Sequence, residues 1–329
     1  MKKILRYALL LAVMTLAFAP VFTTNAQGCP EGLSADDCAL LDAAGKANVT
    51  SFTIEAYTVK LNVKGIPGSE MSADISGTGG MDLSKMGSFD PAKLAESLKD
   101  AAIALTADVK ATQAGTEQAS GLEVRIVEGV VYVKVSQMGD KWYKADLAAV
   151  LANSDSAGID MGTFSGLAGS TGMMDGLGNI PGLITGSAAD GEDIAGVKTR
   201  AITINVNLGA FVSALSDPTA SKGLLEVLKQ AGLPVDDSML QQLTMVAAML
   251  KPVFDNTKIS LTQYIGVDTK MLHGFDINVS VKLDATSAAM LGAASPVDFD
   301  FAFTIRMSKL GEGFTVEPVA DAAELPLNN

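Results

Sequence analysis

The sequence predicts an α+β fold in which one antiparallel β-sheet has a solvated face and an apolar face covered by helices. Three observations support this prediction: strands with alternating polar and apolar residues, a hairpin within Val130–Leu147, and two strongly apolar helical segments in the second half. Alternation with a period of two places every second side chain on one face of a strand. This pattern is typical of sheets with one solvent-exposed face and one buried face.

The clearest strands lie in the second half of the chain. Their polar and apolar residues alternate without interruption through Ala201–Leu208, Phe275–Leu283 and Val297–Met307. The last of these places Phe299, Phe301 and Phe303 on the same face, so this strand should contribute aromatic side chains to the apolar side of the sheet.

The first half has weaker alternation and one break in its phase. We expect strands at Ser51–Lys64, Met71–Leu83, Ala102–Thr112 and Lys141–Ala145, with a hairpin that turns at Glu128-Gly129. In the first strand, Ile54 and Tyr57 are an odd number of residues apart. A β-bulge near Glu55 would return both side chains to one face and add curvature.

Helices are expected before the first strand and between the later ones. Ser34 is a predicted N-cap, and Asp36 and Asp37 follow in the first turn, where the helix dipole favours acidic residues. Leu224–Leu228 is a short apolar helical segment, and Met239–Phe254 is apolar nearly all round. Because a helix of the second kind must be buried on several sides, we expect it to cover the sheet.

Residues 152–196 separate the two halves and contain no lysine or arginine. The segment is rich in glycine and has scattered hydrophobic side chains that continue to Leu183 and Ile184. The candidates for a lid are Met161, Phe164, Met173, Met174, Leu177 and Ile180. We expect a mobile, sticky lid or loop; a poorly ordered connector would have the same composition.

Residues 1–26 have the composition of a secretory signal peptide. Three cations precede the apolar run Tyr7–Ala19, which is too short to span a bilayer comfortably, and small residues before Gln27 fit a cleavage site. We therefore expect a single domain at 27–329, with an insertion at about 152–196, that is secreted, periplasmic or displayed at the cell surface. An uncleaved anchor is the alternative.

The two cysteines, Cys29 and Cys38, lie just after the predicted cleavage site. In an oxidising compartment, a disulfide between them would fasten the N-terminus to the domain. The alternative is a lipid anchor on Cys29. That alternative requires a lipobox which residues 26–29 fit poorly, and it would leave Cys38 as a free thiol.

Composition and motifs argue against several classes of function. The net charge is −13, and it becomes −16 once residues 1–26 are removed, so nucleic acid and anionic surfaces are repelled. The sequence has no Gly-x-Ser-x-Gly elbow, phosphate loop or dinucleotide fingerprint. The single histidine, His273, cannot build the usual zinc site. We therefore predict no catalytic residue, no metal and no cofactor.

Short stretches of the chain carry a family resemblance: Val131-Tyr132-Val133-Lys134, Asp140–Leu147, and Ile259–Gly266 followed by Asp268 and Leu272. In these stretches the chain resembles the LolA-like superfamily, in particular exported lipid-carrier proteins of the LppX and LprG type. The resemblance implies an incomplete, strongly curved antiparallel β-barrel with helices over its concave face. It also implies an apolar cavity between sheet and helices that binds acyl chains of lipids or lipoproteins.

The candidates for lining such a cavity come from the two apolar helices and the phenylalanine strand. They are Leu224, Leu228, Leu240, Leu243, Met245, Met249, Phe299, Phe301 and Phe303. Because burial of one methylene group contributes about 0.8 kcal/mol, roughly ten carbons would contribute about 8 kcal/mol before ordering costs. No charged anchor for the ligand is then needed.

We therefore predict a non-enzymatic carrier whose partner is a lipid or lipoprotein acyl chain, with a transient contact to the membrane. A surface or adhesion module is the main alternative, because the same residues could close a dry core without a ligand. A hydrolase that acts on apolar substrates is a third hypothesis, and it lacks a nucleophile paired with a base in the sequence.

Overall fold

The computed structural model describes residues 29–66, 70–86, 94–113, 115–139, 141–152, 181–216, 245, 251–290, 293 and 295–325. The strands are β1 (Ser51–Lys64), β2 (Met71–Asp82), β3 (Ala102–Gln113), β4 (Thr116–Val127), β5 (Val130–Val135), β6 (Trp142–Asp146), β7 (Ile184–Ile194), β8 (Val197–Val206), β9 (Thr257–Gly266), β10 (Leu272–Leu283), β11 (Val297–Ser308) and β12 (Ala323–Glu324). The helices are α2 (Ala35–Lys46), α3 (Leu94–Ser97), α4 (Leu147–Ala152), α7 (Leu208–Ser216) and α10 (Ala285–Met290), with a 3₁₀ turn η3 at Ser136–Met138.

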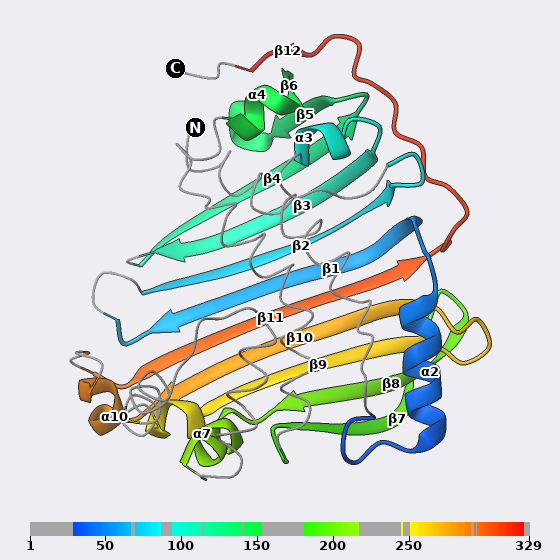
Figure 1. The fold of residues 1–329 in the computed structure, drawn as a ribbon. Helices are drawn as coiled ribbons and strands as arrows, with labels where there is room; N and C mark the ends of the chain where they lie inside the picture. The colour runs from blue at the N-terminus through cyan, green and yellow to red at the C-terminus, as the bar shows by residue number, and fades with distance from the viewer. Residues whose placement is uncertain are drawn as a thin grey trace.

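All twelve strands belong to one open sheet (Figure 1). Their order is β12-β6-β5-β4-β3-β2-β1-β11-β10-β9-β8-β7. Neighbouring strands are antiparallel, except that the short β12 runs parallel to β6. Because β12 and β7 are the two edges and do not pair with each other, the barrel is incomplete. The predicted α+β class with an open antiparallel sheet is confirmed.

The predicted bulge in β1 is confirmed. The pairing of β1 with β11 shifts register between Ile54 and Ala56, and its pairing with β2 shifts between Ile54 and Tyr57. The shift returns Ile54 and Tyr57 to the same face, where both are fully buried. The extra residue therefore keeps one continuous apolar face along the strand.

The predicted hairpin turn at Glu128-Gly129 is also confirmed. Glu128 and Gly129 both have positive φ angles, 54° and 72°, as a two-residue type I′ turn between antiparallel strands requires. The turn sets the register in which Val124 lies opposite Val133. Both side chains belong to the main hydrophobic core, so the turn fixes which face of β4 and β5 is buried.

Helices pack against the apolar face of the sheet. Leu98, which follows α3, and Leu147 and Val150 of α4 belong to the core cluster of β1–β6. On the same face, but at the strands β8 and β9, Leu41 of α2 packs against Ile202 and Ile265 in a separate cluster. The apolar segments 221–250 lie outside the described residues, apart from Met245.

The N-terminal segment has two internal restraints and an ion pair with the sheet. Ser34 caps α2 by accepting a hydrogen bond from the backbone N–H of Asp37. Arg200 of β8 donates to the Asp37 carboxylate at 2.8 Å, and the bonds from Arg200 and Ser34 lower the pKa of Asp37. Cys29 and Cys38 form the expected disulfide. A thiol joined in a disulfide cannot carry a thioether lipid. The structure therefore favours the disulfide over the lipid anchor at Cys29.

One part of the expected insertion is not a loop. Residues 184–194 form the edge strand β7, and Leu183 is buried beside α7. The glycines of β7 lie very close to neighbouring segments. A Cβ on Gly186 would lie 2.5 Å from the Leu33 side chain, and one on Gly191 would lie 2.3 Å from the Thr199 side chain. The composition that suggested a loop therefore reflects tight packing of the N-terminal segment and β8 against this edge.

The sheet bends strongly at the corner where β7 ends. Glu192 of β7 forms an ion pair with Arg306 of β11, although three strands lie between them in the sheet. In a flat sheet, four strand spacings would separate the two backbones by about 19 Å, beyond the combined reach of these side chains. The end of β7 must therefore curl over β8–β10 toward β11.

Arg306 is held at this corner by several groups at once. Its guanidinium lies 4.1 Å from the ring centre of Tyr264, and it donates to the Asp276 carboxylate at 2.7 Å. Tyr264 donates to Asp276 as well, and burial together with this bond raises the pKa of Tyr264 to about 12. The side chain of Arg306 can lie across β10 because Gly274 has no Cβ, which would come within 2.9 Å of the arginine Cδ.

The chain after β11 forms a strap along the ends of β1–β5 and reaches β6 (Figure 1). Ser51 accepts a hydrogen bond from the backbone N–H of Gly313, and Arg125 donates to the carbonyl of Glu317. The strap ends in β12, which covers part of the β6 edge. A covered edge is protected from pairing with other chains.

We predict that Arg306→Met loosens the curled end of β7, while the backbone amides in the rest of the sheet stay protected from hydrogen exchange. Hydrogen exchange should accelerate at residues 192–198, and the free energy of unfolding should fall by about 1–3 kcal/mol, because charge-assisted bonds at a partly buried site are lost. Lys46→Met is the matched control, since it breaks an exposed pair with Asp42 and should change stability very little. Unchanged exchange in 192–198 would contradict this account of the corner.

Candidate functional site

The apolar face of the sheet is sealed at one end of its strands. One cross-strand row consists of Tyr57, Ile305, Phe275, Gln263 and Ile202, which lie opposite one another on β1, β11, β10, β9 and β8. Each of these side chains is no more than 5% exposed. Helix α2, the end of β7 and the strap all lie toward this end, which we call the sealed end (Figure 1).

Burial decreases in the next row. Val59 and Phe303 are buried, whereas their row neighbours Ile277, Leu261 and Ile204 are only half-buried. The face therefore begins to open on the side of β8–β10.

The last two rows are half-buried throughout. The first consists of Leu61, Phe301, Val279, Ile259 and Val206, and the second of Val63, Phe299, Val281 and Thr257. We call these nine residues the open rows. They lie at the end of the sheet where β1 ends and β11 begins, which we call the open end.

The open rows carry no charged side chain. Charged and amide groups of the same strands, including Lys60, Asn62 and Asp300, alternate with them and lie on the opposite face. Each row crosses four or five strands, so the longer row spans about 19 Å of apolar surface. A surface of this width and chemistry can bind extended hydrocarbon. Its single hydroxyl group, on Thr257, donates a hydrogen bond to the carbonyl of Val253.

The structure places the predicted cavity residues at different depths. Phe299 and Phe301 lie in the open rows, and Phe303 is buried and stacks near Phe275, with ring centres 5.4 Å apart. Met245 lies in a helix and is 69% exposed, so its side chain does not add to the buried apolar surface.

The remaining predicted cavity and lid residues lie outside the described residues. They are Leu224, Leu228, Leu240, Leu243 and Met249 for the cavity, and Met161, Phe164, Met173, Met174, Leu177 and Ile180 for the lid.

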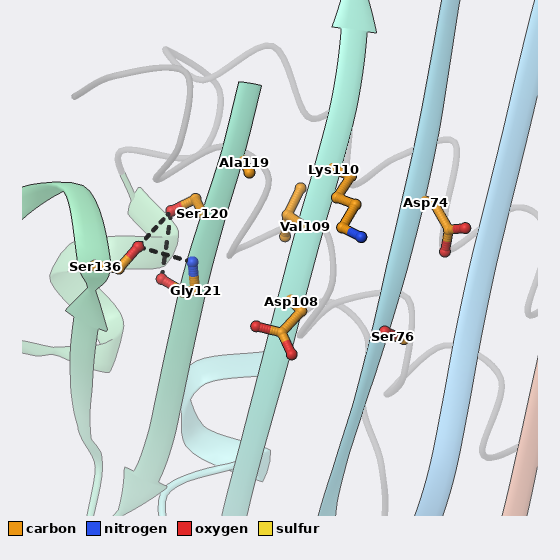
Figure 2. A pocket seen from close by; sticks show the side chains of 9 residues that line it. All are labelled: Asp74, Ser76, Asp108, Val109, Lys110, Ala119, Ser120, Gly121 and Ser136. Carbon is orange, nitrogen blue, oxygen red and sulfur yellow. Dashed lines mark hydrogen bonds between the residues drawn. The ribbon is translucent and has the colours of Figure 1, made fainter. Parts of the chain in front are cut away.

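A separate hollow of about 450 Å³ lies on the polar face of β2–β4 (Figure 2). It is lined by Asp74, Ser76, Asp108, Val109, Lys110, Ala119, Ser120, Gly121 and Ser136. The sequence analysis did not identify it. The β2–β3 register places Asp74 opposite Lys110 and Ser76 opposite Asp108. In the sequence these residues look like ordinary solvent-exposed strand positions, so nothing distinguishes them as the lining of a hollow.

The hydroxyl groups of the hollow are not arranged as nucleophiles. Ser136 accepts a hydrogen bond from the backbone N–H of Gly121 at 2.8 Å and lies 3.5 Å from the Ser120 hydroxyl. Neither contact supplies the general base that a catalytic serine requires. The hollow is a solvated depression that mixes acidic and basic side chains, and it lies on the face opposite the open rows.

The part of the chain that the structure describes has neither a metal-binding cluster nor a membrane-spanning helix. Within it, no three His, Cys, Asp or Glu side chains come together in a way that could hold a metal ion. No described helix combines the length and the apolar character needed to cross a membrane.

Comparison with known proteins gives a weak similarity. No protein-family model matches the chain, and no curated protein matches it. Among solved structures, the chain is similar to LprF from Mycobacterium bovis, with 13% sequence identity and a TM-score of 0.35 over 88% of this chain and 99% of that chain.

His273 is buried close to the sealed end, and its environment favours the neutral ring. Its Nε2 lies 3.0 Å from the Thr269 hydroxyl, and Nδ1 has no hydrogen-bond partner among the described residues. Burial lowers the pKa of His273 below its usual value of 6.5. We therefore assign His273 a packing role at this end of the sheet.

We predict that His273 makes the protein less stable in mild acid. Below pH 6.5 the unfolded chain binds a proton at this residue while the folded protein resists it, so stability falls as pH decreases, by at most about 1.4 kcal/mol per pH unit. Urea unfolding at pH 7.5 and pH 5 gives the free energy of unfolding at each pH. Between these pH values it should change less for His273→Gln than for the unmodified protein. Equal differences would contradict the assigned environment.

Proposed function

We propose that this protein is an exported, non-enzymatic carrier that binds acyl chains of lipids or lipoproteins against the open rows. The observation that supports this proposal is the uncharged apolar surface that runs across β1, β11, β10, β9 and β8 and becomes more exposed toward one end. A protein that only needs a closed core has no reason to leave two adjacent aromatic residues, Phe299 and Phe301, half-buried.

The chemistry of the surface favours hydrocarbon as the ligand. Each methylene group removed from water contributes about 0.8 kcal/mol, so a long acyl chain binds without a charged anchor. Phe299 and Phe301 supply broad contact area, and the flanking Val279, Val281 and Ile259 add branched side chains that make the surface continuous. Such a surface tolerates chains of different length, because no charged group fixes their position.

Export is the second part of the proposal. The Cys29–Cys38 disulfide is typical of proteins that fold in an oxidising compartment, and the cationic and apolar start of the chain has the composition of a signal peptide. A carrier in such a compartment would shield acyl chains from water between membranes.

We predict that Val279→Asp abolishes lipid binding, whereas Asn278→Asp does not. The two residues are neighbours on β10; Val279 lies in the open rows, and Asn278 is exposed on the opposite face. Both changes add one carboxylate, but only the first places an ionised group against the proposed hydrocarbon. Native mass spectrometry of the exported protein, followed by extraction and identification of lipids, measures the bound fraction.

The experiment requires variants that fold. Val281→Gln, nearer the open end where a polar group can reach water, is a milder second variant and should reduce the bound fraction in part. Circular dichroism and thermal unfolding establish folding for each variant. If the unmodified protein has no stoichiometric adduct, even after incubation with membrane lipid, the carrier function is wrong, and a surface module with a filled core becomes the better account.

A further inference from the structure

One edge strand of the sheet, β7, is covered in part by the segment that precedes α2 (Figure 1). Glu31 forms a parallel bridge with Thr185, and its carbonyl accepts a hydrogen bond from the backbone N–H of Gly186 at 2.6 Å. We call residues 30–33 the edge cover. The cover gives a partner to an N–H group that points outward from the edge of the sheet.

Two glycines allow the cover to lie this close to β7. Gly32 has a φ angle of 96°, and a Cβ on it would lie 2.4 Å from the Gly186 carbonyl oxygen. On the strand, a Cβ on Gly186 would collide with the Leu33 side chain. Leu33 packs in turn on the cluster that contains Ile202 and Ile265. A side chain at position 32 would therefore push the cover away from the strand.

The cover is attached at both of its ends, but in different ways. At its C-terminal end it continues into α2, which the Asp37–Arg200 ion pair and buried Leu41 hold on the sheet. At its N-terminal end it is attached by the Cys29–Cys38 disulfide, whose second cysteine lies in α2. Opening the disulfide would leave α2 in place and leave the cover tied at one end, as in the fraying terminus of a chain.

We propose that the Cys29–Cys38 disulfide is a redox-sensitive clasp that keeps the edge cover on β7, and that a dithiol reductant releases the cover without unfolding the strand. The bond is accessible, because Cys29 is exposed. Two thiol–disulfide exchanges break this S–S bond and form one in the reductant, whose two thiol protons end on the cysteine sulfurs. The cysteines are nine positions apart, so the closed bond strongly restricts the released state of the cover.

Release of the cover would lengthen the open part of the β7 edge. The Leu183 carbonyl accepts a hydrogen bond from Asn207, so Leu183 and every second residue after it face β8. Gly186, Ala188 and Asp190 therefore direct their backbone groups away from β8. Without the cover, these three residues form a continuous edge of the kind that pairs with extended chains. The clasp thus makes the exposure of this edge depend on redox conditions, whether or not the protein carries lipid.

Residue-resolved hydrogen exchange by NMR, with and without dithiothreitol, tests the proposal. The chain contains two cysteines, so the reagent has no second disulfide to open. We expect reduction to accelerate exchange of the Gly186 amide about tenfold or more, because the restraint on the released cover is lost. The amide of Ser187, which faces β8, is the internal control and should keep its rate.

Variants test the same step without the reagent. The double substitution Cys29→Ser and Cys38→Ser should reproduce the fast exchange of Gly186, and dithiothreitol should then have no effect. Gly32→Ala should release the cover while the disulfide stays closed, because the new Cβ collides with the Gly186 carbonyl. Gly115→Ala is the matched control, since Gly115 also has a positive φ angle but a Cβ there meets nothing within 4 Å. It should leave the exchange of Gly186 unchanged.

Two results would overturn the proposal. Equal exchange of Gly186 in the oxidised and the reduced protein would show that packing, rather than the disulfide, holds the cover. Acceleration at Gly186 and Ser187 alike would show that reduction unfolds β7 as a whole, so that the disulfide is a general stabiliser and not a clasp. The measurement involves no lipid, so neither result bears on the carrier function.

Discussion

The register that joins β1, β11 and β10 is the constraint on which the rest of the structure depends. Leu61 lies opposite Phe301, and Phe301 lies opposite Val279, so apolar residues of three strands form one surface. Because side chains alternate along a strand, a slip of one residue would replace this surface with the polar groups of the opposite face. The bulge at Glu55 maintains this register along β1, since it brings Ile54 and Tyr57 to the same side.

The two ends of this surface differ in how they are restrained. At the sealed end, the curl of β7 toward Arg306, the ion pair of α2 with Arg200 and the strap after β11 add polar restraints. The open rows lack comparable restraints among the described residues, and their side chains remain half-buried. If the open rows bind hydrocarbon as proposed, they can adapt to it while the restrained end keeps the shape of the sheet.

Local physical chemistry decided which features could be predicted from the sequence. The bulge, the Glu128-Gly129 turn, the Ser34 cap and the three alternating strands of the second half depend on neighbouring residues, and all of them form. The first of these strands is shorter at its end than expected, because Leu208 begins α7 instead of continuing β8. Strand β7 was missed because Gly186 and Gly191 resemble loop glycines, although they mark contacts with Leu33 and Thr199. The burial gradient along Phe303, Phe301 and Phe299 could not be predicted, because identical residue types in one alternating strand give no information on how far the cover extends.

A crystal structure of the protein isolated from its exported form tests the central claim most directly. If the open rows bind acyl chains, elongated density that belongs to no residue of the chain should run beside Phe299, Phe301 and Val279. If side chains of this same chain fill that space in close contact with Phe299 and Phe301, the surface is part of a closed core, and the carrier account is contradicted.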